Sequence, residues 1–221
     1  QNGYSIEENL TLEDLKEFRQ LGSLTPGHPE VGHTPGVEVT TGPLGQGFAN
    51  AVGMAISERW LREKFGAENI SHNVFVICGD GDLSEGVSHE AASLAGSQQL
   101  GNLICIYDDN HITIDGPTEL SLADDAAKRF EAYGWNVIDL GESGEDLDVI
   151  ENALLEGKSN TTSPTIIILR THIGHPSPTL TDSPSAHGYA FKDKEIIEAK
   201  ELINYFIFDL IILDRMMPSG D

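Results

Sequence analysis

The sequence predicts an α/β fold, a doubly wound and mostly parallel sheet with helices on both of its faces. Four short apolar runs rich in β-branched residues are separated by stretches with helical periodicity, and glycines and acidic residues directly follow two of these runs. Alternation of strands and helices is typical of parallel sheets, because successive parallel strands need a crossover connection. The expected strands are Val74–Cys78, Leu103–Tyr107, Asn136–Leu140 and Thr165–Arg170.

Helical spacing of apolar residues predicts the remaining elements. A short helix is expected at Leu12–Leu21 behind Thr11, a candidate N-cap, and a long amphipathic helix at Leu44–Phe65. Between them, residues 22–47 are rich in Gly, Pro, Thr and His and lack periodicity, so we expect an ordered loop that carries function. Further helices are expected near Ser88–Gln99, Leu122–Tyr133 and Asp146–Glu156.

The charge of the chain restricts its partners. It has 36 Asp and Glu residues against 13 Lys and Arg, a formal net charge of −23. Such a field repels polyanions, so we expect a small substrate, no nucleic acid and no anionic membrane. No apolar stretch reaches the roughly 18 to 20 residues of a membrane span. A further hypothesis is that the acid excess is an adaptation to salt.

The cysteines indicate the redox compartment of the protein, and the start of the sequence indicates whether it is complete. Cys78 and Cys105 each lie inside a hydrophobic run, which indicates buried free thiols in a reducing compartment, and the cytoplasm is the simplest location. The sequence opens on Gln1 with ordinary folded-domain sequence. We therefore expect the natural N-terminus to lie upstream and the chain to be a fragment.

Oxygen donors follow the first two expected strands, at the edge where parallel sheets bind ligands. The carboxylate of Asp80, the amide oxygen of Asn110 and a main-chain carbonyl two residues later are the hard donors that magnesium prefers. The flanking Gly79 and Gly81 allow close approach of the backbone to a diphosphate. Alone, Gly-Asp-Gly is more often only a tight turn.

The spacing of these residues resembles a known signature. Gly79-Asp80-Gly81, followed after 28 intervening residues by Asn110, is similar to the signature of thiamine diphosphate enzymes. Four longer stretches resemble the transketolase family: FRQLGSLTPGHPE at 18–30, TTGPLGQGFANAVGMA at 40–55, GDGDLSEGVSHEAASLAG at 79–96 and YDDNHITIDG at 107–116. Residues 1–203 thus resemble the N-terminal, diphosphate-binding domain of transketolases, incomplete at its N-terminus.

The resemblance implies thiamine diphosphate bound through Mg²⁺, with Ca²⁺ as an alternative cation. The implied metal ligands are the side chains of Asp80 and Asn110 and the carbonyl of Ile112. The resemblance also implies contacts with the cofactor of two kinds. Glycines and apolar side chains would lie against it, and polar side chains would lie near its diphosphate. These residues are Gly42, Leu44, Gly79, Asp80, Gly81, Asn110, Ile114 and His187.

The resemblance also implies catalytic residues. His28 would face the hydroxyl groups of the substrate and relay protons. Without the motif, the simpler interpretation is a loop histidine that only forms a hydrogen bond with the backbone. His187 would reach the diphosphate and the substrate, in a stretch that matches the family less closely. Glu85 and Glu90 would join a carboxylate network at a dimer interface, and their alternative role is a solvated helix face.

The implied reaction moves a two-carbon ketol unit from a ketose phosphate to an aldose phosphate. The family uses a glutamate from the pyrimidine domain of an opposing subunit, and no residue here matches it. We therefore expect an incomplete or split chain that needs such a partner in a homo- or hetero-oligomer. The alternatives are another thiamine diphosphate enzyme, such as a deoxyxylulose-phosphate synthase or a dehydrogenase component, and a non-catalytic cofactor-binding module.

The last residues have a different character. Residues 204–221 end in FDLIILDRMMPSGD, in which an apolar run delivers Asp214. This resembles the phospho-acceptor strand of a response-regulator receiver, whose other elements do not follow. We expect an unrelated tail without phosphotransfer, and its alternative role is a terminal strand or helix that only packs.

Overall fold

The structure is a computed structural model that describes residues 10–188 and 191–205. Its strands are β1 (Val74–Gly79), β2 (Leu103–Asp109), β3 (Ile112–Thr113), β4 (Gly116–Pro117), β5 (Asn136–Asp139) and β6 (Thr165–Arg170). Its helices are α1 (Leu12–Lys16), α2 (Gln46–Phe65), α3 (Asp80–Ser84), α4 (Gly86–Ser97), α5 (Ala126–Ala132), α6 (Leu147–Ser159) and α7 (Asp193–Tyr205). Short 3-10 turns are η1 (Thr118–Leu120), η2 (Gly141–Ser143) and η3 (Pro184–Ala186).

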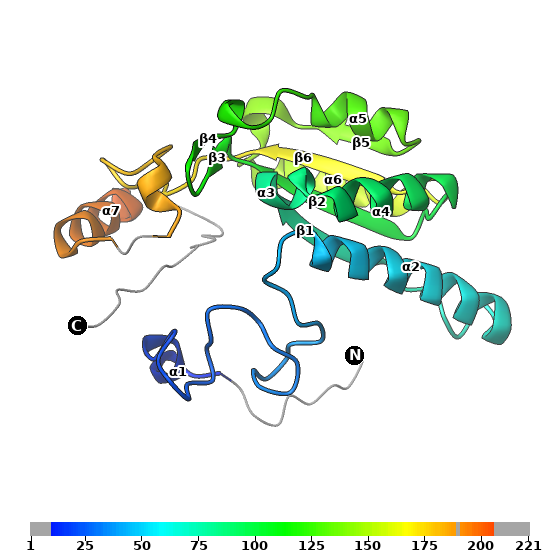
Figure 1. Cartoon of the computed structure of the whole chain (residues 1–221), viewed down its shortest axis with the longest axis horizontal. Helices are drawn as coiled ribbons and strands as arrows, with labels where there is room; N and C mark the ends of the chain where they lie inside the picture. Colours follow the sequence, from blue (N-terminus) through cyan, green and yellow to red (C-terminus); the bar gives the residue numbers. More distant parts are fainter. Residues whose placement is uncertain (1–9, 189–190, 206–221) are drawn as a thin grey trace.

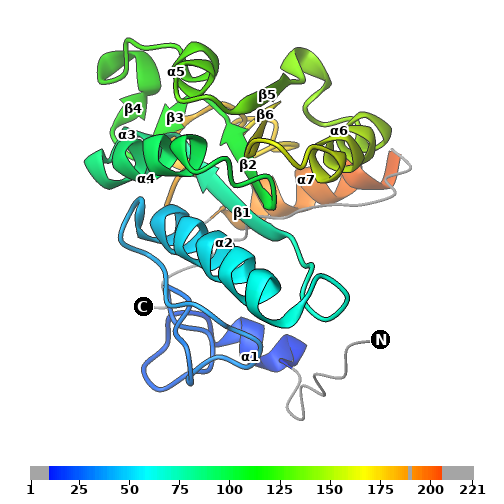
Figure 2. The same cartoon turned by 90° about the vertical axis from the view of Figure 1, so that its right-hand side faces the viewer.

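A parallel sheet in the order β1-β2-β6-β5 forms the centre of the molecule (Figure 1). The chain advances from β1 through β2 to β5, then reverses to insert β6 between β2 and β5. Because crossovers are right-handed, the reversal requires α6 to cover the opposite face from α4 and α5. Figure 2 shows α2, α4 and α5 on one side of the sheet and α6 on the other. The prediction of a doubly wound α/β fold is confirmed.

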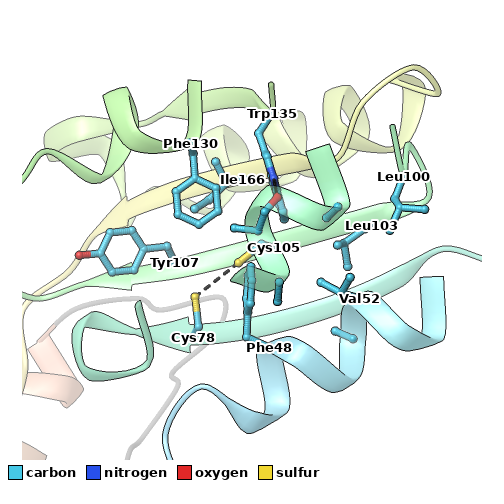
Figure 3. Close-up of a cluster of buried hydrophobic side chains, with 14 of the residues drawn as sticks. Phe48, Val52, Cys78, Leu100, Leu103, Cys105, Tyr107, Phe130, Trp135 and Ile166 are labelled. Carbon is cyan, nitrogen blue, oxygen red and sulfur yellow. Dashed lines mark hydrogen bonds between the residues drawn. The ribbon is translucent and has the colours of Figure 1, made fainter. Parts of the chain in front are cut away.

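The larger hydrophobic core lies between the sheet and the layer of α2, α4 and α5 (Figure 3). Its aromatic centre has Phe48 stacked on Trp135 with ring centroids 6.0 Å apart, and Phe130 edge-on to Trp135 at 5.0 Å. The Trp135 indole donates to the carbonyl of Ala92 at 2.9 Å, so its buried N–H is satisfied. A smaller core around Ile104, on the other face of the sheet, packs against α6.

Helix ends depend on caps that periodicity does not reveal. Thr11 caps α1 as expected, but α1 ends at Lys16, and the expected extent to Leu21 is wrong because Arg19 has a left-handed φ of 64°. Likewise α5 begins only after Asp125, whose side chain accepts from the Lys128 N–H at 3.1 Å. None of the described helices has the length and apolar character needed to cross a membrane.

The two cysteines are buried free thiols, as predicted. Their sulfur atoms lie 3.4 Å apart between β1 and β2, without a disulfide (Figure 3). Contact with the Cys105 thiol, reinforced by burial, raises the pKa of Cys78 well above its ordinary value. Cys78 is therefore an uncharged part of the core, and the cytoplasmic location stays a prediction.

Two glycines in helices should respond oppositely to alanine. A Cβ at Gly96 of α4 would lie 1.8 Å from the carbonyl oxygen of Tyr133, whereas a Cβ at Gly53 of α2 would meet nothing within 4 Å. We expect Gly96→Ala to lower the free energy of unfolding by about 3 kcal/mol through overpacking. Gly53→Ala should raise it by about 0.5–1 kcal/mol, because alanine favours the helix. Urea unfolding of both variants tests this, and equal effects would contradict the packing of α4 against Tyr133.

Candidate functional site

The carboxyl ends of the parallel strands lie together at one end of the sheet, beside the β3–β4 hairpin (Figure 1). β1 ends at Gly79 and leads directly into α3, while β2 ends at Asp109 and leads into the β3–β4 hairpin. α3 contacts both β2 and β3. The Gly79-Asp80-Gly81 turn and the segment around Ile112 therefore lie side by side, as the sequence predicts.

Asp80 has one carboxylate oxygen without a partner. The residue is only 4% exposed. Its Oδ1 accepts a hydrogen bond of 2.7 Å from the Tyr107 hydroxyl, whereas Oδ2 is buried without any hydrogen bond. Unpaired buried carboxylate oxygens are costly, and a bound cation is a common explanation for them. The orphan oxygen of Asp80 thus fits the role of a magnesium ligand.

The electrostatics of this pair depend on burial and on neighbouring carboxylates. Burial raises the pKa of Asp80, the hydrogen bond from Tyr107 lowers it, and the nearby Asp109 raises it. Burial and the same carboxylates raise the pKa of Tyr107 well above its ordinary value, so the hydroxyl remains a neutral donor. A divalent cation beside Asp80 would favour its ionised form.

Asn110 has an amide whose orientation is defined by both of its atoms. Its Oδ1 accepts from the Ile112 N–H at 2.9 Å, and its Nδ2 donates to Asp108 Oδ2 at 3.2 Å. Between them, His111 has a left-handed φ of 63°, which turns the chain sharply after β2. The second lone pair of Oδ1 and the carbonyl of Ile112 are hard donors of the predicted kind.

The predicted donor set is mixed in chemistry. Among the described residues, no group of three or more His, Cys, Asp or Glu side chains could hold a metal ion. One carboxylate, one amide and one main-chain carbonyl suit magnesium, which keeps other positions for phosphate oxygens and water. The donor chemistry therefore fits a cation bound together with a phosphate-bearing ligand.

Tyr107 was not among the residues singled out from the sequence, yet it orients Asp80. We expect Tyr107→Phe to weaken magnesium-dependent binding of thiamine diphosphate about tenfold, the usual cost of removing a hydrogen bond to a metal ligand. Calorimetric titration measures this. Tyr133→Phe is the matched control, because its hydroxyl contacts His89 at 3.0 Å instead of Asp80. Equal affinities for the two variants would show that Tyr107 does not orient the ligand.

The loop before α2 brings further predicted residues together. Gly42 has a φ of 134°, and a Cβ there would lie 2.6 Å from the His28 ring, so the imidazole rests directly against this glycine. Leu44 packs over Gly81, where a Cβ would lie 3.2 Å from its Cδ1. By contrast, a Cβ at Gly79 would meet nothing within 4 Å, which leaves the turn open to a ligand. His28, Gly42, Leu44 and Gly81 thus form two adjoining contacts.

A cavity of about 410 Å³ lies beside this loop. Its wall contains Gly42 and Leu44 from the loop, Phe75 and Ile77 from β1, and Asp82 from α3. A second cavity, of about 250 Å³, lies behind Asp80 and includes Tyr107 and Asp109. One cavity therefore borders the Gly79-Asp80-Gly81 turn, and the other borders the loop that carries Leu44.

The remaining predicted residues lie on the surface of the chain. Glu85 is the N-cap residue of α4 and is exposed, as is Glu90 within the helix. Ile114 is 66% exposed at the β3–β4 hairpin. His187 is exposed after η3, and the described hydrogen bonds include none from its ring. No described contact joins these four to Asp80, and their roles stay predictions.

Comparisons with known proteins agree with the motifs. The family model described as transketolase, thiamine diphosphate binding domain, matches residues 2–207. A transketolase from Aquifex aeolicus is 56% identical over 198 residues, which are 88% of this chain and 28% of that protein. A crystal structure of transketolase from Campylobacter jejuni has a TM-score of 0.85 at 45% identity, covering 89% of this chain and 30% of that one.

A Pichia stipitis transketolase in complex with sedoheptulose-7-phosphate gives a TM-score of 0.86 at 43% identity, over 90% of this chain and 30% of that one. Fold and motifs together define a thiamine diphosphate-binding domain. The chain belongs to the transketolase family. It spans less than a third of the length of the relatives it matches and so corresponds to a fragment of them.

Proposed function

We propose that this chain binds thiamine diphosphate through Mg²⁺ and contributes the diphosphate-binding part of an active transketolase. The orphan Oδ2 of Asp80 carries the proposal, because it is a buried oxygen without a partner in the turn that the family uses for this cofactor. Asp80, Asn110 and the carbonyl of Ile112 would hold the cation. Ca²⁺ offers the same oxygen-donor chemistry as an alternative.

The glycines and the loop before α2 would shape the rest of the cofactor site. Gly79 and Gly81 would let the backbone approach the diphosphate, while Gly42, Leu44 and Ile114 would contact the rings. When bound, the cofactor would supply a nucleophilic carbon for the ketose carbonyl and a ring system that accepts the electron pair released when the adjacent carbon–carbon bond breaks. His28, resting on Gly42, would position the hydroxyl groups of the substrate and relay protons, and His187 would assist from the loop after β6.

The complete reaction would need a second domain. We propose that a ketose phosphate and an aldose phosphate are the donor and acceptor, and that a pyrimidine domain from another polypeptide completes the site. Glu85, the N-cap residue of α4, and Glu90 within that helix are both exposed, and we propose that they form a carboxylate network across a dimer interface.

Calorimetric titration of the chain with thiamine diphosphate tests the proposal directly. We expect saturable binding in the presence of MgCl₂ and its loss when EDTA removes the cation, because the diphosphate is bound largely through the metal. Binding that is indifferent to EDTA would exclude the proposed magnesium site. No binding under either condition would exclude the cofactor assignment for this chain.

A further inference from the structure

Asp82 lies between two segments of the proposed cofactor site and bonds to both. Its Oδ2 accepts from the Gly79 N–H at 3.0 Å, at the end of β1. Its Oδ1 accepts from the Gly45 N–H at 2.9 Å, at the start of α2. One carboxylate thus joins the Gly79-Asp80-Gly81 turn to the loop that carries Gly42 and Leu44.

The described hydrogen bonds include no other that joins these two segments. Gly45 is buried with a φ of 75°, and a Cβ there would lie 2.8 Å from Ser88 Oγ, so the loop packs closely against α4 at this point. Ser88 in turn donates to the Asp82 carbonyl at 2.5 Å. Main chain and side chain of Asp82 are therefore both fixed.

Each of the two N–H groups belongs to a helix start. Gly79 and Gly45 are the N-cap residues of α3 and α2, and neither has a side chain that could cap its helix. A carboxylate bonded to such N–H groups forms strong, charge-assisted hydrogen bonds and also meets the positive ends of the helix dipoles. This makes Asp82 a stiff link and not an incidental surface contact.

We propose that Asp82 is a positioning residue that sets the distance between the diphosphate end and the ring end of the cofactor site. The inference rests on the proposed function. A ligand that contacts both ends needs the turn and the loop at a fixed distance from each other, whereas a ligand that occupies only the turn does not. Asp82 also lines the 410 Å³ cavity beside the loop, together with Leu44.

The test compares a spanning ligand with a short one. Calorimetry measures the binding of thiamine diphosphate and of inorganic pyrophosphate, each with MgCl₂, to the unaltered chain and to Asp82→Ala. Loss of a charge-assisted hydrogen bond that aligns both segments should weaken thiamine diphosphate about tenfold. Pyrophosphate should lose less than about twofold, because it needs only the turn, which the hydroxyls of Ser84 and Ser88 still hold through the carbonyls of Asp80 and Asp82.

Asp82→Asn is a second variant in case the alanine variant does not fold, since it keeps the side-chain shape and can retain one of the two bonds. Asp146→Ala is the matched control: Asp146 also accepts two backbone N–H bonds, from Asp148 at 3.0 Å and Val149 at 3.2 Å, at the start of α6. It should lower the thermal midpoint without altering the ratio of the two affinities.

Equal losses for both ligands, or unchanged affinity for thiamine diphosphate, would overturn the positioning role while leaving the proposed function intact. A similar loss of thiamine diphosphate affinity in Asp146→Ala would overturn it too, because general destabilisation would then account for the effect. If the unaltered chain binds neither ligand, the proposed function fails and this inference fails with it.

Discussion

The purified 221-residue chain should give no measurable ketol transfer from xylulose 5-phosphate to ribose 5-phosphate, and activity should appear when a transketolase pyrimidine domain is added. The physical reason is that the described residues, which in the proposed function would hold the cation and one side of the cofactor, offer no counterpart to the glutamate that the resemblance places on the opposing domain. Without that group, formation of the reactive thiazolium carbon lacks its acid–base partner, which is commonly worth about 10²–10⁴ in rate.

A coupled assay of the aldose-phosphate product, with the partner domain titrated into a fixed amount of chain, measures this effect. Activity should saturate with the partner and require both thiamine diphosphate and MgCl₂. Asp80→Ala with the same partner is the control, and it should stay inactive at every partner concentration. Substantial turnover by the chain alone would mean that it contains a complete active site.

The strands were predictable because β-branched runs define them almost by themselves. β1, β2 and β6 begin where expected, and their ends differ from the prediction by two residues at most. The direct passage from β1 into α3, without an intervening residue, was not predictable from periodicity. α3 lies in the polar sequence DGDLS, where the Asp82 side chain accepts a hydrogen bond from the N–H of Gly79, the N-cap residue.

The site residues that lie in sequence motifs could be predicted, whereas a residue that joins the site only through a buried contact could not. The sequence places Asp80 and Asn110 at neighbouring strand ends, and the structure brings their segments together. In the sequence, Tyr107 continues the hydrophobic pattern of a strand. Its hydrogen bond to Asp80 is therefore known only from the structure. A tyrosine directly before the strand's polar end was the available signal, because buried hydroxyls need a partner.

The chain beyond β6 was less accessible to prediction. No helix was expected between Arg170 and residue 203, yet α7 spans Asp193–Tyr205. The periodicity of the preceding stretch is interrupted by prolines and glycines, which conceal where regular structure resumes. The receiver-like tail begins at residue 204, at the end of α7, and from residue 206 onward it lies outside the described residues. Its assignment stays a prediction.

Asp80→Asn should abolish magnesium-dependent cofactor binding and at the same time stabilise the cofactor-free chain. Removing the charge deletes the proposed metal ligand, while asparagine keeps an oxygen to accept from Tyr107. The free energy of unfolding at pH 7 should rise by roughly 1 kcal/mol, or about 2–4 °C in Tm, because a buried charge without a counter-ion no longer has to be desolvated.

The pH dependence of this gain follows from the direction of the pKa shift. Burial raises the pKa of Asp80 above its ordinary value of 3.8, so the folded chain binds the proton more tightly than the unfolded chain. This contribution to stability is fully present below the unfolded pKa and is lost as the pH rises through the folded pKa. The difference in Tm between Asp80→Asn and the unaltered chain should therefore grow as the pH is raised from about 4 to 7.

Thermal unfolding of the cofactor-free proteins across this pH range measures the difference, and Asp125→Asn is a control of opposite sign. The hydrogen bond from Lys128 lowers the pKa of Asp125, so its charge stabilises the fold above the unfolded pKa, and this variant should lose stability at pH 7. If Asp80→Asn were also less stable than the unaltered chain at pH 7, Asp80 would have to be a structural ion and not a carboxylate held ready for a cation. A gain in Tm together with lost cofactor binding would instead show that the buried Asp80 carboxylate lowers the stability of the cofactor-free chain because it serves as a metal ligand.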